Sequence, residues 1–240
     1  RWYFVGTDYE HGHEAVGFAQ KALAEKYGDA FKSVGESWAK PGEVNYASAI
    51  TNALAAKPDV VFVVVPGRFV QFQNQAAAMG LTKASHIHWS YGERPSAEAA
   101  GDAAFGVTAT VDYVEDNPEW KRSKEFALRY HKRFGEWPGW PASSTYQGTR
   151  LFLMAIEKAK SLEAAKIMRA VQGMEDPNPI TGRPYAVRAC AQKSIQPLYT
   201  VQWTKSQEFA PGHWKLLKKY AQPQNALLPC SVKANYDKMK

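Results

Sequence analysis

The sequence has no long apolar run and none of the compositional biases that mark non-globular chains. No apolar run, including Val60–Val65, exceeds six residues, whereas a membrane-spanning helix needs about 20. Hydrophobic residues make up 45% of the chain and charged residues 22%, which excludes collagen-like, coiled-coil and disordered structure. The sequence starts at Arg1 without a signal peptide, so we expect any targeting segment to lie outside these residues.

Cysteine is scarce. Only Cys190 and Cys230 are present, 40 residues apart, and they fit no Cys-x-x-Cys pattern of a metal or redox site. Neither is flanked by a histidine or an acidic residue that would activate its thiol. A disulfide in an exported protein and two unrelated free thiols both remain open at this point.

The common catalytic motifs are also missing. The sequence contains no G-x-S-x-G, H-E-x-x-H, G-x-x-x-x-G-K-[ST] or G-x-G-x-x-G pattern, which are the patterns of hydrolases, metalloproteases, P-loop enzymes and dinucleotide-binding enzymes. We therefore predict a protein that is not an enzyme and carries no cofactor.

Histidine occurs in two closely spaced pairs. The pair His11 and His13, flanked by Glu10 and Glu14, resembles a metal site, but zinc needs a third ligand at fixed geometry and nothing nearby supplies one. The pair His86 and His88 alternates along a predicted strand, so both side chains face one side of it. We interpret that second pair as structural and predict no metal site.

The formal net charge is +7, from 30 basic and 23 acidic residues. It is distributed unevenly, because residues 1–117 hold 9 basic against 14 acidic residues, whereas residues 118–240 hold 21 against 9. The basic residues are spread along predicted helices, as expected of a solvated face, and no zinc-finger or RNA-binding signature accompanies them. We predict no nucleic-acid partner and interpret the asymmetry as a sign that the halves belong to different lobes.

The first half of the chain alternates between strand and helix. Strands are predicted over residues 2–6, 31–38, 60–65, 86–90 and 106–111, and helices over residues 13–27, 46–56 and 69–79. The continuous β-branched run from Val60 is typical of a strand buried on both faces of a parallel sheet. This alternation predicts an α/β fold whose ligands bind at the carboxyl ends of the strands.

The second half is mainly helical. Helices are predicted over residues 119–134, 144–160 and 162–172, with a loop over 135–141, extended pieces at 185–189 and 198–203, and a last 36 residues rich in loops. Helices with a broad apolar face need a partner surface, and residues 118–240 contain too few strands to provide one.

Several short motifs occur in an order and spacing that resemble a known family. They are Asp8-Tyr9-x-x-Gly12, Asn45-Tyr46, Ala56–Phe62, Gln75-x-x-x-Met79-Gly80-Leu81, Ala100-Gly101 before Gly106-Val107-x-x-Thr110, and Tyr146 before Ala155–Ala159. Over about residues 1–205 the chain is similar to the branched-chain amino-acid-type solute-binding proteins of ABC transporters. The resemblance implies the type I periplasmic binding protein fold, in which two α/β lobes joined by three crossovers hold ligand in the cleft between them.

The resemblance also implies a domain map. Residues 1–117 would form the second, C-terminal lobe with its Rossmann-like parallel sheet, residues 118–195 would return to the first lobe, and residues 196–240 would cross back and form a tail. Most of the N-terminal lobe would then be missing from this sequence. The segment from Arg188 to Tyr199, with the late Cys230, resembles a subgroup in which Cys190 and Cys230 form a disulfide, which suits an exported protein.

The ligand-binding residues implied by the resemblance follow strand ends. They are Tyr9, Gly67, Arg68, Tyr91, Glu93 and Tyr146. Arg68 would bind a carboxylate, Glu93 would bind an amino group, and Tyr146 would line the hinge side of the cleft. The segment Trp89–Tyr91 departs from the small residues usual in the family. With Phe69 near another strand end, it leaves an apolar or aromatic acid as a ligand.

The function implied is that of an exported, periplasmic or extracellular solute-binding protein. It would capture an amino acid or another small carboxylate, including an aromatic acid, and deliver it to ABC permease subunits by hinge closure. Two alternatives remain: a ligand-sensing domain of a signalling system with the same fold, and a Rossmann-like enzyme using Glu93, Tyr9 or the His11 and His13 pair.

Overall fold

A computed structural model describes residues 1–189 and 194–220. Among the described residues the chain divides into two compact units, the first formed by residues 1–110 and 201–215 and the second by residues 111–189, 194–200 and 216–220. The chain passes between them within β5 (Thr108–Val111), β8 (Leu198–Lys205) and β9 (Gly212–Tyr220). None of the helices in the described residues has the length and apolar character needed to span a bilayer.

The central sheet has seven strands in the order β2-β1-β3-β4-β5-β8-β9. The other strand bounds are β1 Trp2–Thr7, β2 Ser33–Ala39, β3 Val60–Val64 and β4 His86–Trp89. The pairings of β1 with β2, β1 with β3, β3 with β4 and β4 with β5 are all parallel, because each crossover contains a helix. The predicted α/β class, with a mostly parallel sheet, is confirmed.

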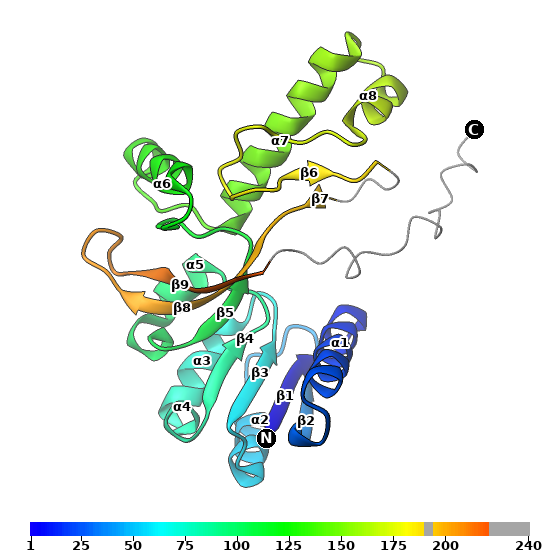
Figure 1. The fold of residues 1–240 in the computed structure, drawn as a ribbon. Helices are drawn as coiled ribbons and strands as arrows, with labels where there is room; N and C mark the ends of the chain where they lie inside the picture. The colour runs from blue at the N-terminus through cyan, green and yellow to red at the C-terminus, as the bar shows by residue number, and fades with distance from the viewer. Residues whose placement is uncertain (190–193, 221–240) are drawn as a thin grey trace. The chain divides into compact units, whose positions relative to one another are not determined.

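Helices flank the sheet on both sides. Their bounds in the first unit are α1 Glu10–Tyr27, α2 Ala47–Ala56, α3 Phe69–Ala78, α4 Leu81–Ala84 and α5 Arg94–Ala100. Figure 1 shows α1 on one side of the sheet and the later helices on the other. Against α1, the core consists of Phe4, Val16 and Val64, with Phe62 packed at its edge.

The opposite core is built around stacked aromatic rings. Trp89 has no exposed surface, and its ring centroid lies 4.8 Å from that of Phe69 and 6.3 Å from that of Trp214. Its indole nitrogen donates to the side-chain oxygen of Gln73 at 3.2 Å. The polar end of this large side chain is thus satisfied inside the core.

A buried arginine fixes the β8–β9 segment to α5. The Arg94 side chain is 1% exposed. Its Nη2 donates to the carbonyl oxygens of Phe209 at 2.9 Å and Gly212 at 2.8 Å. The guanidinium carbon lies 5.4 Å from the centre of the Trp203 ring. Its Nε donates to Oε1 of Glu98 at 2.7 Å. A buried charge is tolerated only with such complete pairing.

The histidine pair on β4 lies on the α1 side of the sheet. His86 and His88 both contact the hydroxyl of Thr108, as expected of two residues on one face of a strand, and the His88 ring stacks on Phe62 at 5.7 Å. Burial lowers the pKa of His86, and burial together with the charge of His86 lowers the pKa of His88 to about 4.

The second unit is mostly helical. Its elements are α6 Lys121–Phe134, α7 Trp140–Ala159, α8 Ala164–Val171, and the short paired strands β6 Ala186–Val187 and β7 Ser194–Ile195. Tyr113, Phe126 and Ile180 form its small core. The buried Asp176 carboxylate accepts hydrogen bonds from Gln147 and Arg150 on α7, which fixes α7 to the chain that follows α8.

Two elements were not predicted from the sequence, and one predicted boundary was wrong. The last 36 residues contain a strand, β9, whose Lys-rich second half lacks an alternating apolar pattern. Helix α5 was not predicted, because it is only seven residues long. Helix α7 begins at Trp140, inside the expected loop 135–141, since Pro141 suits a first helical turn. The expected disulfide between Cys190 and Cys230 lies outside the described residues and stays a prediction.

Candidate functional site

Three neighbouring parallel strands end at one edge of the sheet. β1 pairs with β3, and β3 pairs with β4, so the loops after Thr7, Val64 and Trp89 lie at the same edge. The loop after β4 is held there, because the backbone N–H of Ser90 donates to the carbonyl of Val63 at 2.9 Å, and that of Gly92 to Thr110 at 2.8 Å. These loops carry five of the six predicted ligand-binding residues.

Tyr9 lies between β1 and α1. It is the residue before the first helical turn, has an extended backbone, and its side chain is 39% exposed. Its ring lies 5.9 Å from that of His11, while the neighbouring Asp8 carboxylate is 2.8 Å from Nε2 of His13. Tyr9 is therefore an accessible loop residue and not part of the core.

Arg68 lies between β3 and α3. The turn is closed by a hydrogen bond of 2.9 Å from its backbone N–H to the carbonyl of Val65, and the exposed Gly67 within it has φ +69°, which favours glycine. The Arg68 side chain is half-buried. Among the described residues, no carboxylate lies within ion-pairing distance of its guanidinium. This cation is available to an anionic ligand.

Arg68 also lies close to a buried tyrosine. Burial raises the pKa of Tyr46 to about 12, and the positive charge of Arg68 opposes that shift. The Tyr46 ring packs edge-on against Phe72 at 5.6 Å, and its backbone N–H donates to the side chain of Gln75. Arg68 therefore lies near a tyrosine that is buried in the core.

Glu93 and Tyr91 lie between β4 and α5, and both are half-buried. Glu93 directly precedes the helix, and its Oε2 accepts a hydrogen bond of 2.8 Å from the hydroxyl of Ser96. Ser96 was not singled out in the sequence. Residues three apart lie close together on a helix, but the sequence did not predict α5 and so gave no signal for this pair.

Two aromatic residues thought to favour an aromatic ligand do not lie at this surface. Trp89 has no exposed surface and Phe69 is 2% exposed, because their rings stack on each other inside the core. Trp89 is the last residue of β4, directly before the loop that carries Tyr91. Phe69 is the first residue of α3, directly after the loop that carries Arg68. Of the three residues proposed for that role, only Tyr91 is accessible.

Tyr146 belongs to the second unit, so it is not grouped with the other five. It is 37% exposed on α7, and its ring lies 5.0 Å from that of Phe126 on α6. It lines an open pocket of about 390 Å³ with Tyr130, Phe134 and the guanidinium groups of Arg129 and Arg133.

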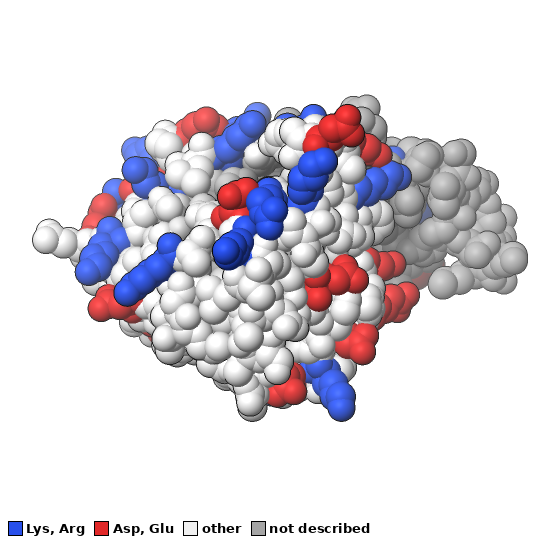
Figure 2. Space-filling model, turned by 90° about the horizontal axis from the view of Figure 1, so that it is seen from below, with Lys and Arg blue, Asp and Glu red and all other residues white. Residues whose placement is uncertain are grey.

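Metal clusters of three or more ligands are absent from the described side chains, and basic and acidic side chains are mixed on the face that Figure 2 draws. Within residues 1–189 and 194–220, no group of three or more His, Cys, Asp or Glu side chains could hold a metal ion. On the face drawn in Figure 2, Lys and Arg side chains are interspersed with Asp and Glu and do not form an area of one sign.

Comparisons with known proteins settle the class of the protein. A family model described as periplasmic binding protein matches residues 1–208. The chain belongs to the periplasmic binding protein family. Proteins of this family bind substrates and are not enzymes, and a search of curated proteins found no match to this one.

Solved structures share the fold of this periplasmic binding protein. The amino acid ABC transporter substrate-binding protein of Pseudomonas fluorescens Pf-5 has a TM-score of 0.82 at 20% identity, over 97% of this chain and 61% of its own. A solute-binding protein from Rhodopseudomonas palustris BisB5, in complex with 3,4-dihydroxybenzoic acid, has a TM-score of 0.81 at 24% identity over 92% and 60%. A benzoate complex from R. palustris has a TM-score of 0.75 at 18% identity over 92% and 58%.

The chain spans about 60% of the length of these structures. Their likeness to it therefore establishes the type I periplasmic binding protein fold of the matched part.

Proposed function

We propose that this periplasmic binding protein captures a small carboxylate at the carboxyl-end edge of its sheet and delivers it to an ABC permease. The observation that carries the proposal is Arg68, a half-buried guanidinium that has no carboxylate partner among the described residues. A guanidinium binds a carboxylate through two parallel hydrogen bonds, which gives both affinity and orientation.

Helix dipoles support an anionic ligand at the same edge. Helices α1 and α3 both begin there, directly after Tyr9 and Arg68. The first backbone N–H groups of a helix have no partner within the helix, and they carry partial positive charge. Together with Arg68, they favour a negatively charged group near Tyr9 and Gly67.

The remaining polar groups define the rest of the ligand. Tyr91 offers a ring and a hydroxyl, and Glu93 offers a carboxylate that already accepts the Ser96 hydroxyl at 2.8 Å. That carboxylate retains acceptor positions for an amino group or a phenolic hydroxyl. An amino acid and a hydroxylated aromatic acid both satisfy this pattern, and both kinds of ligand appear in the names of similar structures.

The predicted domain division is part of the proposal. Residues 1–117 would form the second, C-terminal lobe and one wall of the site, residues 118–195 would belong to the first lobe, and residues 196–240 would cross back to the second lobe and form the tail. Tyr146 is assigned to the opposite wall. The rest of that wall is expected in the part of the longer structures that has no counterpart here. Ligand contact with both walls would favour a closed form, and export to the periplasm or cell exterior follows from the family.

A thermal-shift panel tests the proposal. Amino acids, benzoate, hydroxybenzoates and dicarboxylates are each added to the chain and to any longer form of the protein. A ligand at 100 times its Kd stabilises the folded state by about 2.7 kcal/mol, which raises Tm by roughly 5–10 °C for a domain of this size.

The matched variants are Arg68→Gln and Lys83→Gln. Lys83 is exposed on α4, and its removal should leave the shift unchanged, whereas Arg68→Gln should abolish it. An equal shift in both variants would rule out the assigned role of Arg68. A longer form that responds to no carboxylate would contradict the proposed function itself.

A further inference from the structure

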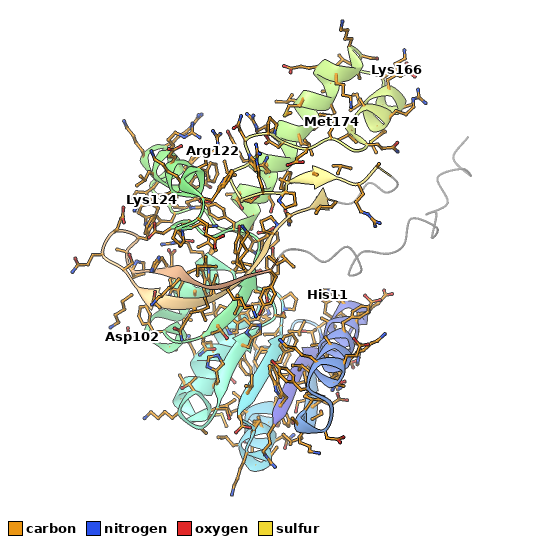
Figure 3. All side chains as sticks on the ribbon, viewed as in Figure 1. His11, Asp102, Arg122, Lys124, Lys166 and Met174 are labelled. Atoms are coloured by element: carbon orange, nitrogen blue, oxygen red, sulfur yellow. The ribbon has the colours of Figure 1, made fainter. Side chains whose placement is uncertain are left out.

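The pattern His-x-His occurs twice in this chain, and the two pairs have different geometries. His11, which Figure 3 labels, and His13 lie in the first turn of α1. Residues two apart point to different sides of a helix. His13 contacts the Asp8 carboxylate at 2.8 Å and packs on the Trp38 ring at 3.8 Å, whereas the ring of His11 lies near Tyr9. The nitrogens of this pair do not converge.

The second pair does converge. His86 and His88 lie on β4, and their side chains share one face because they are two residues apart on a strand. The register places His88 opposite Thr108 on β5. Nε2 of His86 is 2.7 Å from the Thr108 hydroxyl oxygen, and Nδ1 of His88 is 2.9 Å from the same atom. Two imidazole nitrogens therefore face one point, which the hydroxyl oxygen of Thr108 occupies.

Convergence of imidazole nitrogens is what a transition-metal ion requires. Imidazole is a preferred ligand of Zn²⁺, Ni²⁺ and Cu²⁺, and each metal–nitrogen bond is only about 2.0–2.1 Å long. Two ligands must therefore face one point, as this pair does. Access is also available, since His86 is exposed and His88 is only half-buried.

We propose that His86 and His88 bind one divalent transition-metal ion, which replaces the Thr108 hydroxyl as the shared partner of the two nitrogens, with water in the remaining positions. Only two protein nitrogens are involved, so the site agrees with the lack of any three-residue cluster in the described part of the chain. The Irving–Williams order predicts stronger binding of Cu²⁺ than of Ni²⁺ or Zn²⁺.

This site is separate from the proposed carboxylate site. His86 is the first residue of β4, whereas Tyr91 and Glu93 follow its last residue, Trp89. Four strand residues cover roughly 13 Å at 3.3 Å per residue. Metal binding is therefore expected without an organic ligand, and substitutions at His86 should leave carboxylate binding unchanged.

The test is calorimetric titration of the untagged 240-residue chain with NiCl₂ and CuSO₄ in a buffer that does not chelate metals. The expected result is saturable binding of one ion per chain. His86→Gln should weaken metal binding at least about tenfold. Even the loss of a residue that only hydrogen-bonds to a metal ligand lowers metal affinity about 10–100-fold. Because the His86 side chain is exposed, we expect this variant to fold like the parent chain.

A double variant, His11→Gln with His13→Gln, is the matched control, since it removes the same sequence pattern from α1. It should bind like the parent chain. His88→Gln, once its melting curve shows a folded protein, should also bind at least about tenfold more weakly. Absence of saturable binding, or a loss confined to the His11 and His13 variant, would overturn the proposal.

Discussion

Gly12 lies against Thr7 so closely that a Cβ atom on it would be 2.0 Å from the Thr7 carbonyl oxygen. The first turn of α1 thus packs directly on the end of β1, and only glycine fits between them. This contact sets the position of the loop that carries Tyr9.

Gly12→Ala should therefore destabilise the protein by about 1–3 kcal/mol, the usual cost of overpacking. The matched control is Gly17→Ala on the same helix, where a Cβ meets no atom within 4 Å. Because alanine favours a helix over glycine by about 1 kcal/mol, that variant should be as stable as the parent or more so. Urea unfolding of both variants checks this, and equal losses would contradict the contact.

Arg94→Met should lower the free energy of unfolding by about 3 kcal/mol. The change removes charged donors from the carbonyl oxygens of Phe209 and Gly212, and hydrogen bonds to charged groups contribute roughly 1.5–3 kcal/mol. Arg129→Met on the exposed face of α6 is the control and should change stability by less than about 0.5 kcal/mol. A small effect of Arg94→Met in chemical denaturation would mean that the β8–β9 segment is held by other contacts.

Stability should fall steeply in alkali. Burial raises the pKa of Tyr46 and of Tyr199 from 10.0 to about 12, so both favour the folded state while protonated. This contribution is complete below pH 10, where the unfolded chain is also protonated, and it is lost as pH rises from about 10 to 12.

Two phenylalanine variants test the alkaline prediction. Each tyrosine contributes roughly 2–3 kcal/mol, from a shift of two pKa units at 1.36 kcal/mol per unit. Tyr46→Phe keeps the contact of its ring with Phe72 and should flatten the profile measured by urea unfolding between pH 9 and 12. A slope equal to that of the parent would contradict the burial of the hydroxyl.

The 240-residue chain should bind a hydrophobic dye through α7. Phe152 and Leu153 are 50% and 55% exposed, and Leu153, Met154 and Tyr146 line an open groove of about 580 Å³ along one helix face. Apolar patches of this kind adsorb hydrophobic probes. Replacement of Phe152 and Leu153 by serine should reduce dye fluorescence, while serine at Phe18 and Tyr27 on α1 should reduce it less. Equal reductions would argue against an α7 patch.

Local patterns predicted most of the first unit. The run from Val60 to Val65, and the turn residues after each strand, predicted the parallel sheet and the edge where Tyr9, Arg68 and Glu93 lie. Periodicity could not predict side-chain direction at strand ends. Trp89 precedes a loop residue, yet it points into the core because the pleat alternates at each position.

The sequence also could not predict which polar groups form hydrogen bonds with one another. Ser96 and Glu93 are three residues apart, but Arg94 and Gly212 are 118 apart, and only the tertiary fold brings them together. The strand β9 was missed because its exposed lysines give it a polar composition, and its pairing with β8 provides the hydrogen bonds that its sequence pattern does not indicate.

The stack of Trp89 on Phe69 places a buried fluorescent side chain beside two candidate ligand-binding loops. Phe69 follows Arg68 directly, and Trp89 is two residues from Tyr91, so the indole touches the supports of two candidate ligand-binding loops. Trp214 and Trp203 lie in series behind it, with ring separations of 6.3 Å and 5.0 Å, and can pass excitation energy along the row. If the proposed carboxylate binds at these loops and moves either of them, we expect the tryptophan emission of the unlabelled protein to change on binding.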